Sequence, residues 1–442
     1  MDIIGRRKSR YPGARGILAM RDRSSVAATA ERLSGDVVPP DRPHLLCVGG
    51  EDHQLRIPFL SELNRSGLRI VAAGTADPAP FLLAGFSYWP IQMNRFISPA
   101  ADRITIGQLQ QIIRQTRPHI VQSFDTKPNL FVPWAARSIP GTRVVRTING
   151  MGWVYSSRSP LALTLRLVQR ALHRRAAQCS DVTIFQNSRD KAFFETNALV
   201  APDRALLIPG SGVDLDGFDR AVAEGQTPAQ LRHALDLGDA EVVMTVTRLT
   251  RQKGIPALLR AASIVHKLRP GVRFLLVGPR DNEGPFAVTT AEIERHAPYV
   301  VAIGPRSDVP ALLQMADVFV FPTEYREGVP RALLEAALAG LPLIATNMPG
   351  CDDIVRDGWS GRLVKTNAPR QLAAAIIDML CDRAAARAMG ARAAQTVRAQ
   401  FGLAMTVERY LDVYRRLLSP RPALSTFSGR SSSDLVGSSL SA

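Results

Sequence analysis

Short apolar runs alternate along this chain with stretches whose apolar residues recur at helical spacing. Five such runs lie in the first half and five in the second, with helical patterns between them. Strands that alternate with helices are typical of a doubly wound parallel sheet. The pattern therefore predicts an α/β protein with two similar halves. The predicted strands are 44–48, 68–72, 120–124, 143–148 and 182–186, then 242–247, 273–277, 299–303, 318–321 and 343–345.

The ends of the chain differ from its body in composition. The amino-terminal segment is basic and rich in Gly, Ser and Pro, and the tail from Pro420 is rich in Ser. Neither carries a sustained apolar period, so we expect both to be disordered. A final helix carries apolar residues on one face: Val407, Tyr410, Leu411, Tyr414 and Leu417. The expected division is a disordered segment 1–42, domains over 43–210 and 211–400, the helix 401–419 and a disordered tail 420–442.

The bulk composition is that of a globular protein with substantial cores. Of the 442 residues, 46% are hydrophobic. No apolar run approaches the roughly 18 residues that a membrane-spanning helix needs. The basic amino terminus lacks the apolar stretch of a secretory signal. The four cysteines are scattered, without the spacing of metal or redox sites. We therefore expect a cytoplasmic protein with reduced thiols.

Positive charge is concentrated in the first half of the chain. Through residue 215 there are 28 Lys and Arg against 16 Asp and Glu, which accounts for +12 of the net charge of +16. Such a field can serve nucleic acid, an anionic membrane surface or a phosphorylated acceptor. The sequence contains no zinc-finger, RNP-type or other nucleic-acid motif. We therefore expect an anionic membrane surface and a lipid pyrophosphate as partners, and no nucleic acid.

One amphipathic stretch, 161–179, supports the expectation of an anionic membrane surface as a partner. Arg166, Arg170 and Arg174 lie opposite an apolar stripe, and Leu163 and Leu167 fall among the arginines. A basic helix with leucines among its cations can rest on an anionic bilayer. The alternative is a core-facing stripe with some exposed leucines.

Two glutamates eight positions apart, Glu327 and Glu335, stand at the entry to a predicted helix behind the apolar run 318–321. Pro330 suits the first turn of that helix, where its missing N–H costs nothing. The unpaired amides of such a turn favour an anion, and the two carboxylates accept hydrogen bonds from hydroxyls. A nucleotide sugar offers both kinds of partner. The alternative is that both glutamates are solvated charges favourable to the helix dipole.

The whole block from Asp317 to Val364 resembles the donor site of the GT-B glycosyltransferases known as family 4. That family includes bacterial enzymes that build capsule, O-antigen and N-linked glycans. The resemblance implies that Glu327 contacts the donor sugar and Glu335 the nucleotide ribose. It also places Gly328 and Val329 in the donor site.

A second element, TVTRLTRQKG, is similar to the R-L-x-x-x-K-G run of this family and matches it at Arg248 and Lys253. Glycosyl transfer expels a nucleoside diphosphate, so fixed cations stabilise the negative charge that grows on the phosphates. The resemblance implies catalytic roles for Arg248, Lys253 and Glu327, with no metal or other cofactor. The alternative is a pair of solvated surface charges. The D-x-D pattern Asp214-Leu215-Asp216 falls in the expected linker near 209–239, so we assign it no metal.

The first domain offers fewer candidates. Gly50 ends a predicted strand, where a glycine lets the backbone approach the donor phosphates or simply makes a turn. Asn149 stands where many family members carry a histidine. Asparagine can hydrogen-bond a sugar or acceptor hydroxyl but cannot act as a base. Its side chain either makes such a contact or supports a turn, and we assign no general base.

The resemblance implies the GT-B architecture, in which two Rossmann-like domains face each other and a C-terminal helix crosses back to the first. The implied reaction is a retaining transfer of a sugar from a nucleotide sugar, expected to be a UDP-sugar, to a lipid-pyrophosphate-linked saccharide. Bacterial surface polysaccharide or glycan synthesis at the inner face of the cytoplasmic membrane is the expected setting. A UDP-sugar epimerase of the same fold and a non-catalytic two-domain sugar-binding protein are the alternatives.

Overall fold

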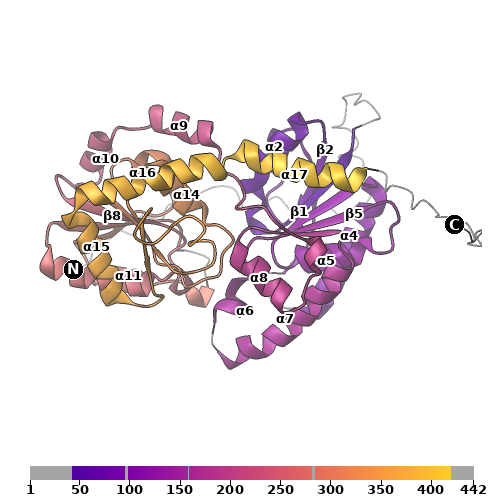
Figure 1. The fold of residues 1–442 in the computed structure, drawn as a ribbon, viewed down its shortest axis with the longest axis horizontal. Helices are drawn as coiled ribbons and strands as arrows, with labels where there is room; N and C mark the ends of the chain where they lie inside the picture. The colour runs from indigo at the N-terminus through magenta and orange to yellow at the C-terminus, as the bar shows by residue number, and fades with distance from the viewer. Residues whose placement is uncertain (1–41, 95–97, 158, 281–283, 420–442) are drawn as a thin grey trace, which may run out of the picture.

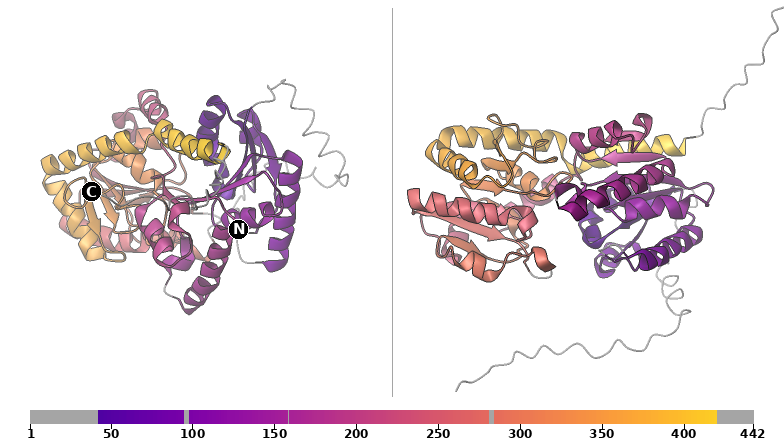
Figure 2. Two further views of the ribbon diagram at one scale, coloured as in Figure 1. Left: turned by 45° about the vertical axis from the view of Figure 1, so that its right-hand side comes forward. Right: turned by 90° about the horizontal axis from the view of Figure 1, so that it is seen from below.

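The computed structural model of the chain describes residues 42–94, 98–157, 159–280 and 284–419. The two segments that we expect to be disordered, 1–42 and 420–442, lie outside these ranges except for residue 42. The described residues form two lobes side by side (Figure 1). Each lobe is a parallel sheet with helices on both faces, as the view from below shows (Figure 2). The predicted α/β class with two Rossmann-like domains is confirmed.

The first lobe contains a seven-stranded sheet in the order β3-β2-β1-β4-β5-β6-β7, and every neighbouring pair is parallel. Its strands are β1 (His44–Gly49), β2 (Arg69–Gly74), β3 (Ser87–Pro90), β4 (Ile120–Phe124), β5 (Arg143–Ile148), β6 (Val182–Phe185) and β7 (Ala205–Leu207). Its helices are α2 (Ile57–Arg65), α3 (Ala79–Leu83), α4 (Pro99–Thr116), α5 (Pro128–Ala136), α6 (Gly152–Ser156), α7 (Pro160–Gln178) and α8 (Ser188–Thr196).

The second lobe repeats the scheme with six parallel strands in the order β10-β9-β8-β11-β12-β13. These strands are β8 (Glu241–Val246), β9 (Val272–Val277), β10 (Val300–Ala302), β11 (Val318–Phe321), β12 (Leu343–Thr346) and β13 (Arg362–Val364). The helices of this half of the chain are α9 (Leu215–Ala223), α10 (Pro228–Ala234), α11 (Ile255–Leu268), α12 (Thr290–Glu294), α13 (Val309–Leu313), α14 (Arg331–Leu338), α15 (Pro369–Cys381), α16 (Arg383–Gln400) and α17 (Leu403–Leu418).

The central strands are buried on both faces, which explains their continuous apolar runs. In β1, Leu45 and Cys47 belong to one core of the first lobe, and Leu46 and Val48 belong to the core on the opposite face. This alternation is the two-residue period of a strand. The second sheet is covered in the same way by two further cores. Each lobe therefore has a rigid sheet that fixes the loops at its carboxyl edge.

All ten predicted strands exist, with ends that differ by at most two residues. The prediction missed β3, β7 and β13, because each has only three or four residues and is partly exposed. All three lie at the edges of the sheets, where one side of the strand has no partner in the sheet. A short edge strand does not need the continuous apolar run that marks a central strand.

The last described helix returns to the first lobe, as the resemblance implies (Figure 1). Tyr410 and Tyr414 on α17 are buried in the core of the first lobe. The Tyr410 hydroxyl lies 2.9 Å from Thr147 Oγ1, and the Tyr414 hydroxyl donates to Gln122 Oε1 at 3.1 Å. These bonds join α17 to β4 and β5. The crossing helix is therefore part of the first lobe's interior.

The chain passes between the lobes twice, and the two crossings are bonded to each other. The Val213 N–H donates to the Phe401 carbonyl at 2.9 Å, and the Leu403 N–H donates to the Val213 carbonyl at 2.8 Å. Gly212, with φ +77°, lies so close to Leu403 and Thr406 that a Cβ at this position would meet both. The two crossings are therefore held side by side.

Candidate active site

The centre of the candidate site lies at the carboxyl edge of the second sheet. Strands β8 and β11 are neighbours, so the loops that follow them meet at this edge. Gly254 follows the first of these loops with φ +73°, and a Cβ there would collide with the carbonyl oxygen of Pro322 after β11. Only glycine permits this close approach without strain. The approach brings Lys253 to the loop that carries Glu327.

Lys253 and Glu327 form an ion pair with 2.6 Å between Nζ and Oε1. Their side chains are only 9% and 18% exposed. Thr323 Oγ1 donates to the same Glu327 oxygen at 3.0 Å. The Lys253 ammonium also lies 5.4 Å from the centroid of the Tyr325 ring. Two of the three predicted catalytic residues are therefore in direct contact and held from several sides.

The other two charged candidates of the second lobe flank this pair in the chain. Arg248 lies two residues after the end of β8 and is half-buried. Glu335 lies on α14 and accepts a hydrogen bond from Arg331 Nε at 2.8 Å. Pro330 is the residue before the first helical turn and not within it, since α14 begins at Arg331. No side chain caps this helix start, which leaves its dipole available to an anion.

In the first lobe, Gly50 and Asn149 converge on a residue that the sequence analysis missed, Asp125. The Gly50 N–H donates to Asp125 Oδ2 at 2.8 Å, and Asn149 Nδ2 donates to Oδ1 at 2.7 Å. Arg56 Nη2 also lies 3.1 Å from Oδ1. Burial acts to raise the pKa of Asp125, but Arg56, Asn149 and Gly50 together hold it below its ordinary value. The Gly50 amide is thus engaged by a carboxylate. The signal for Asp125 was its place directly after the buried run 120–124.

The two lobes touch through backbone at the candidate site. A Cβ on Gly328 would collide with Gln186 Oε1 and lie 3.1 Å from the Asn149 carbonyl carbon. A Cβ on Gly150, which has φ +112°, would lie 2.7 Å from the Arg326 carbonyl oxygen. Asn149 therefore lies beside the loop of Glu327, as the prediction of a shared site requires. Val329 is 8% exposed, and its side chain is part of the packing of the second lobe's core.

Comparison with known proteins identifies the family. The family described as "Glycosyl transferases group 1" matches residues 229–396, which include Arg248, Lys253, Glu327 and Glu335. A GDP-mannose-dependent alpha-(1-6)-phosphatidylinositol monomannoside mannosyltransferase of Mycobacterium tuberculosis is 30% identical over 279 residues, 60% of this chain and 68% of the relative. The chain belongs to the group 1 glycosyl transferases. The alternatives of an epimerase and a binding protein are therefore set aside.

One further relative and one solved structure are also similar to this chain. The N,N'-diacetylbacillosaminyl-diphospho-undecaprenol alpha-1,3-N-acetylgalactosaminyltransferase of Campylobacter jejuni is 26% identical over 310 residues, 70% of this chain and 80% of the relative. The crystal structure of a glycosyltransferase from Rickettsia africae matches 86% of this chain and 100% of its own with a TM-score of 0.72 at 17% identity. The GT-B fold is confirmed, and the chain is a glycosyltransferase.

The arginines of the basic helix are not arranged as we expected. Arg166 donates to the carbonyls of Val154, Tyr155 and Ser157, at 2.8, 3.2 and 2.6 Å, and so stabilises the end of α6. Arg170 lies over the Phe193 ring at 5.3 Å. The prediction that these arginines form an outward face is wrong for both. Arg174, which remains exposed, donates to the carbonyls of Asn197 and Ala198.

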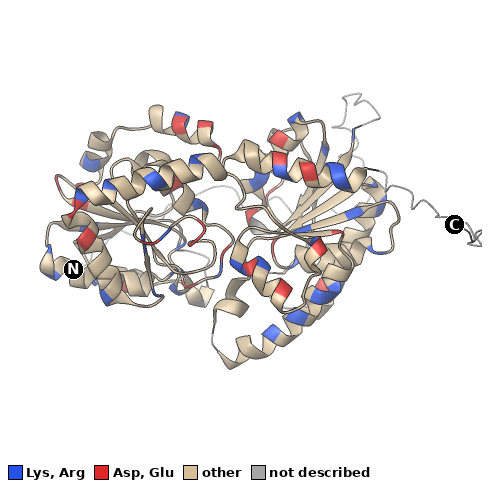
Figure 3. Ribbon diagram, in the orientation of Figure 1, with Lys and Arg blue, Asp and Glu red and all other residues tan. Residues whose placement is uncertain are grey.

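The first turns of α7 instead expose apolar side chains on more than one face. Leu161, Leu163, Leu167 and Val168 are 62%, 49%, 68% and 53% exposed. The first residues of α7 carry no charge, whereas arginines recur further along the helix (Figure 3). Helical periodicity located both faces, but the neighbours α6 and α8 decide which face is covered.

Four further observations concern metal binding, the D-x-D pattern, a surface hollow and membrane-spanning helices. Within the described ranges, no group of three or more His, Cys, Asp or Glu side chains is arranged to hold a metal ion. Asp214 of the D-x-D pattern caps α9 by accepting from the Gly217 N–H at 2.9 Å. A hollow of about 780 Å³ lies at the amino ends of β5 and β6, away from the residues of the site. No helix among the described residues is long and apolar enough to cross a membrane.

Proposed function

We propose that this enzyme transfers a sugar from a UDP-sugar to a saccharide carried on a lipid diphosphate. The transfer retains the anomeric configuration, requires no metal ion and takes place at the inner face of a bacterial cytoplasmic membrane, in the synthesis of a surface polysaccharide or glycan. The observation that carries the proposal is the Lys253–Glu327 pair, fixed at the carboxyl edge of the second sheet in a loop whose backbone lies against Asn149 of the first lobe.

The donor side of the reaction follows from the charges at this edge. When the bond between sugar and phosphate breaks, negative charge grows on the diphosphate, and a fixed cation lowers the energy of that state. Lys253 has three N–H donors, and one of its oxygen partners is Glu327. The other donors and Arg248 can address the phosphates, while the Glu327 carboxylate accepts hydrogen bonds from sugar hydroxyls. Glu335 on α14 then addresses the ribose.

The acceptor side draws on the relatives. The Campylobacter jejuni relative is named for a diphospho-undecaprenol acceptor, and the Mycobacterium tuberculosis relative for a phosphatidylinositol acceptor. Both acceptors are lipids, so the enzyme must work at a bilayer surface. The exposed leucines at the start of α7 provide an apolar contact, and the positive charge of the first half provides attraction to anionic lipid.

The donor proposal is tested by nucleotide release. Purified enzyme is incubated with membrane lipid extract and, in separate reactions, with a panel of UDP- and GDP-sugars. We expect release from one UDP-sugar, a loss of two or more orders of magnitude in Glu327→Gln, and no change in the control Glu224→Gln, which alters an exposed carboxylate at the end of α9. Release from GDP-sugars alone would overturn the UDP assignment. Unchanged nucleotide release in Glu327→Gln would overturn the assignment of Glu327 to the donor site.

The membrane proposal is tested by sedimentation with liposomes. The variant Leu163→Gln/Leu167→Gln should bind anionic vesicles less than wild type. The control Leu268→Gln, which alters a leucine that is 67% exposed on the second lobe, should not. Binding should also fall at high salt, because a shorter Debye length screens the attraction. Equal sedimentation of wild type and the double variant would refute the role of α7.

A further inference from the structure

The residue before Glu327 is bonded to the opposite lobe. Arg326 Nη2 lies 2.5 Å from Asp190 Oδ1 on α8 of the first lobe. The Asp190 side chain is fully buried, and that of Arg326 is 18% exposed. Asp190 is held within its own lobe by Asn187, whose Nδ2 donates to Oδ2 at 3.0 Å and whose Oδ1 accepts from the Asp190 N–H at 2.7 Å. A buried ion pair thus joins residues 136 positions apart.

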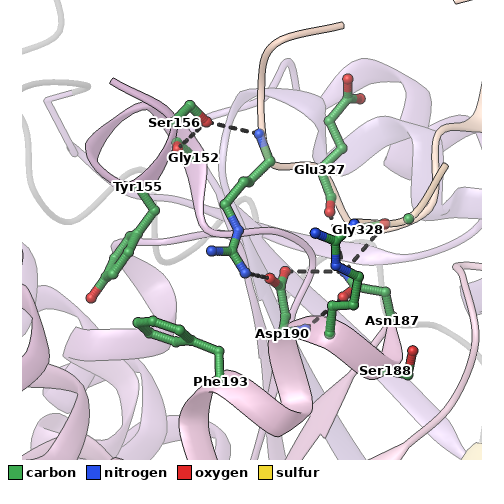
Figure 4. A network of polar contacts seen from close by, with 12 residues as sticks. Gly152, Tyr155, Ser156, Asn187, Ser188, Asp190, Phe193, Glu327 and Gly328 are labelled. Atoms are coloured by element: carbon green, nitrogen blue, oxygen red, sulfur yellow. Dashed lines mark hydrogen bonds and ion pairs between the residues drawn. The ribbon is translucent and has the colours of Figure 1, made fainter. Parts of the chain in front are cut away.

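The backbone of the same loop is bonded to the first lobe as well (Figure 4). The Arg326 N–H donates to Ser156 Oγ at 2.8 Å, and the Arg326 carbonyl accepts from the Gly152 N–H at 3.2 Å. Asn187 Nδ2 donates to the carbonyls of Glu327 and Gly328 at 3.2 and 3.3 Å. These contacts join α6 and the start of α8 to three consecutive residues of the other lobe.

The surroundings of the ion pair favour a joined state of the two lobes. The Arg326 guanidinium lies 5.3 Å from the centroid of Phe193, which packs edge-on against Tyr155. Burial raises the pKa of the Asp190 carboxyl, and Arg326 acts in the opposite direction. A buried carboxylate that loses its cation is costly, so separating the lobes at this point is opposed by an unpaired charge. The pair therefore stabilises the joined lobes relative to separated lobes by more free energy than an exposed pair would.

We propose that Asp190 and Arg326 are positioning residues that couple the contact between the lobes to the placement of Glu327. The proposal rests on the role of Glu327 in the proposed function. The Glu327 side chain is bonded to Lys253 and Thr323 of its own lobe, while its carbonyl is bonded to Asn187 of the other. The residue as a whole is therefore held from both lobes, its carboxylate by the second and its backbone by the first, only when the lobes are joined. Arg248 and Glu335 belong to the second lobe alone, so nucleotide binding does not depend on the pair.

The test separates turnover from nucleotide binding. Arg326→Gln and Asp190→Asn should each lower kcat about 10- to 100-fold, while the Kd for UDP, measured by calorimetry, should change less than threefold. The double variant should lose no more turnover than the less active of the two single variants, because both substitutions break the same interaction. Arg326→Lys should recover part of the turnover lost in Arg326→Gln, because a point charge can still reach Asp190.

A matched control and a second measurement complete the test. Arg189 forms another pair between the lobes, 3.0 Å from Asp352, but its side chain is 45% exposed. Arg189→Gln should therefore change kcat less than threefold. Hydrogen exchange of residues 149–157 and 325–329 should accelerate in Arg326→Gln and not in Arg189→Gln. Arg326→Gln leaves the contacts of Asp190 within the first lobe intact, so it serves even where Asp190→Asn fails to fold.

The outcomes are distinguishable from a failure of the proposed function. Wild-type turnover in Arg326→Gln, additive losses in the double variant or unchanged exchange would each overturn the coupling while Glu327→Gln stays inactive. Wild-type turnover in Glu327→Gln would overturn the proposed donor site itself, and the coupling with it.

Discussion

Replacing Lys253 with glutamine removes the ammonium that lies 2.6 Å from Glu327 and keeps a polar side chain of similar shape. If this cation stabilises the departing diphosphate, its loss resembles the loss of one oxyanion donor, about 2.7–4 kcal/mol of transition-state stabilisation. That energy corresponds to a decrease of roughly 10²- to 10³-fold in kcat. Binding of free UDP should weaken less, because Arg248 and the start of α14 remain.

The same substitution has a separate cost in stability. Removing one partner of a fully buried pair costs about 3–5 kcal/mol. The Lys253 and Glu327 side chains are 9% and 18% exposed, and Thr323 remains bonded to the carboxylate. We therefore expect a smaller loss, about 2 kcal/mol, in the free energy of unfolding. Urea unfolding at pH 7 measures this loss independently of activity.

The two effects are separated by the double variant Lys253→Gln/Glu327→Gln. It leaves no unpaired charge, so its stability should exceed that of Lys253→Gln, whereas its turnover should stay low because both the cation and the Glu327 carboxylate are missing. Nucleotide release at saturating donor gives kcat for Lys253→Gln, Glu327→Gln and the double variant. Turnover within threefold of wild type in Lys253→Gln, or turnover restored in the double variant, would refute a role in leaving-group stabilisation.

Four further outcomes are expected. Glu335→Ala should raise the Kd for UDP about tenfold, the loss of roughly 1.4 kcal/mol from one ribose contact, with kcat at saturation nearly unchanged; the reverse pattern would reassign this residue. Turnover should survive EDTA, and activity lost to EDTA and restored by magnesium would contradict the charge roles of Arg248 and Lys253. Asp125→Asn should lower the free energy of unfolding at pH 7 by about 1–2 kcal/mol. The pKa of Asp125 is depressed in the folded state, so its contribution to the free energy of unfolding is present above the unfolded pKa of about 3.9 and is lost as pH falls through the folded pKa. If the stability difference between Asp125→Asn and wild type stays constant down to about pH 2, ionisation of Asp125 is excluded as its cause. Tyr414→Phe should cost about 1–2 kcal/mol because Gln122 Oε1 loses its buried donor, and an unchanged urea midpoint would show that the bond contributes nothing.

Much of the fold and part of the site could be predicted because they depend on local patterns. Central strands buried on both faces require continuous apolar runs, and parallel strands place the residues after them at one edge. The positions of Lys253 and Glu327 near the ends of β8 and β11 therefore sufficed to bring them together. The roles of the basic residues and of the glutamates at the helix start, by contrast, were predicted from the resemblance to the family.

The remaining features depend on contacts that no local pattern specifies. Asp190 has no distinguishing neighbours in sequence, and its partner Arg326 belongs to the other lobe. Arg166 was assigned to an outward face because periodicity defines the faces of a helix but not what covers them. In the structure it bonds to the end of α6. Both contacts can be recognised only once the packing of one element against another is known.

The return of α17 to the first lobe has a consequence for the order in which the protein is made. Phe59 of α2 packs edge-on against Tyr410, with 4.9 Å between the ring centroids, so the first lobe's interior includes a helix that begins at Leu403. On the ribosome, the whole second lobe is synthesised before that helix appears. Until then the first lobe exposes an apolar face that chaperones or other nascent chains can bind. The lobe that emerges first is thus the last to complete its core, and a chain truncated before α17 retains that exposed face permanently.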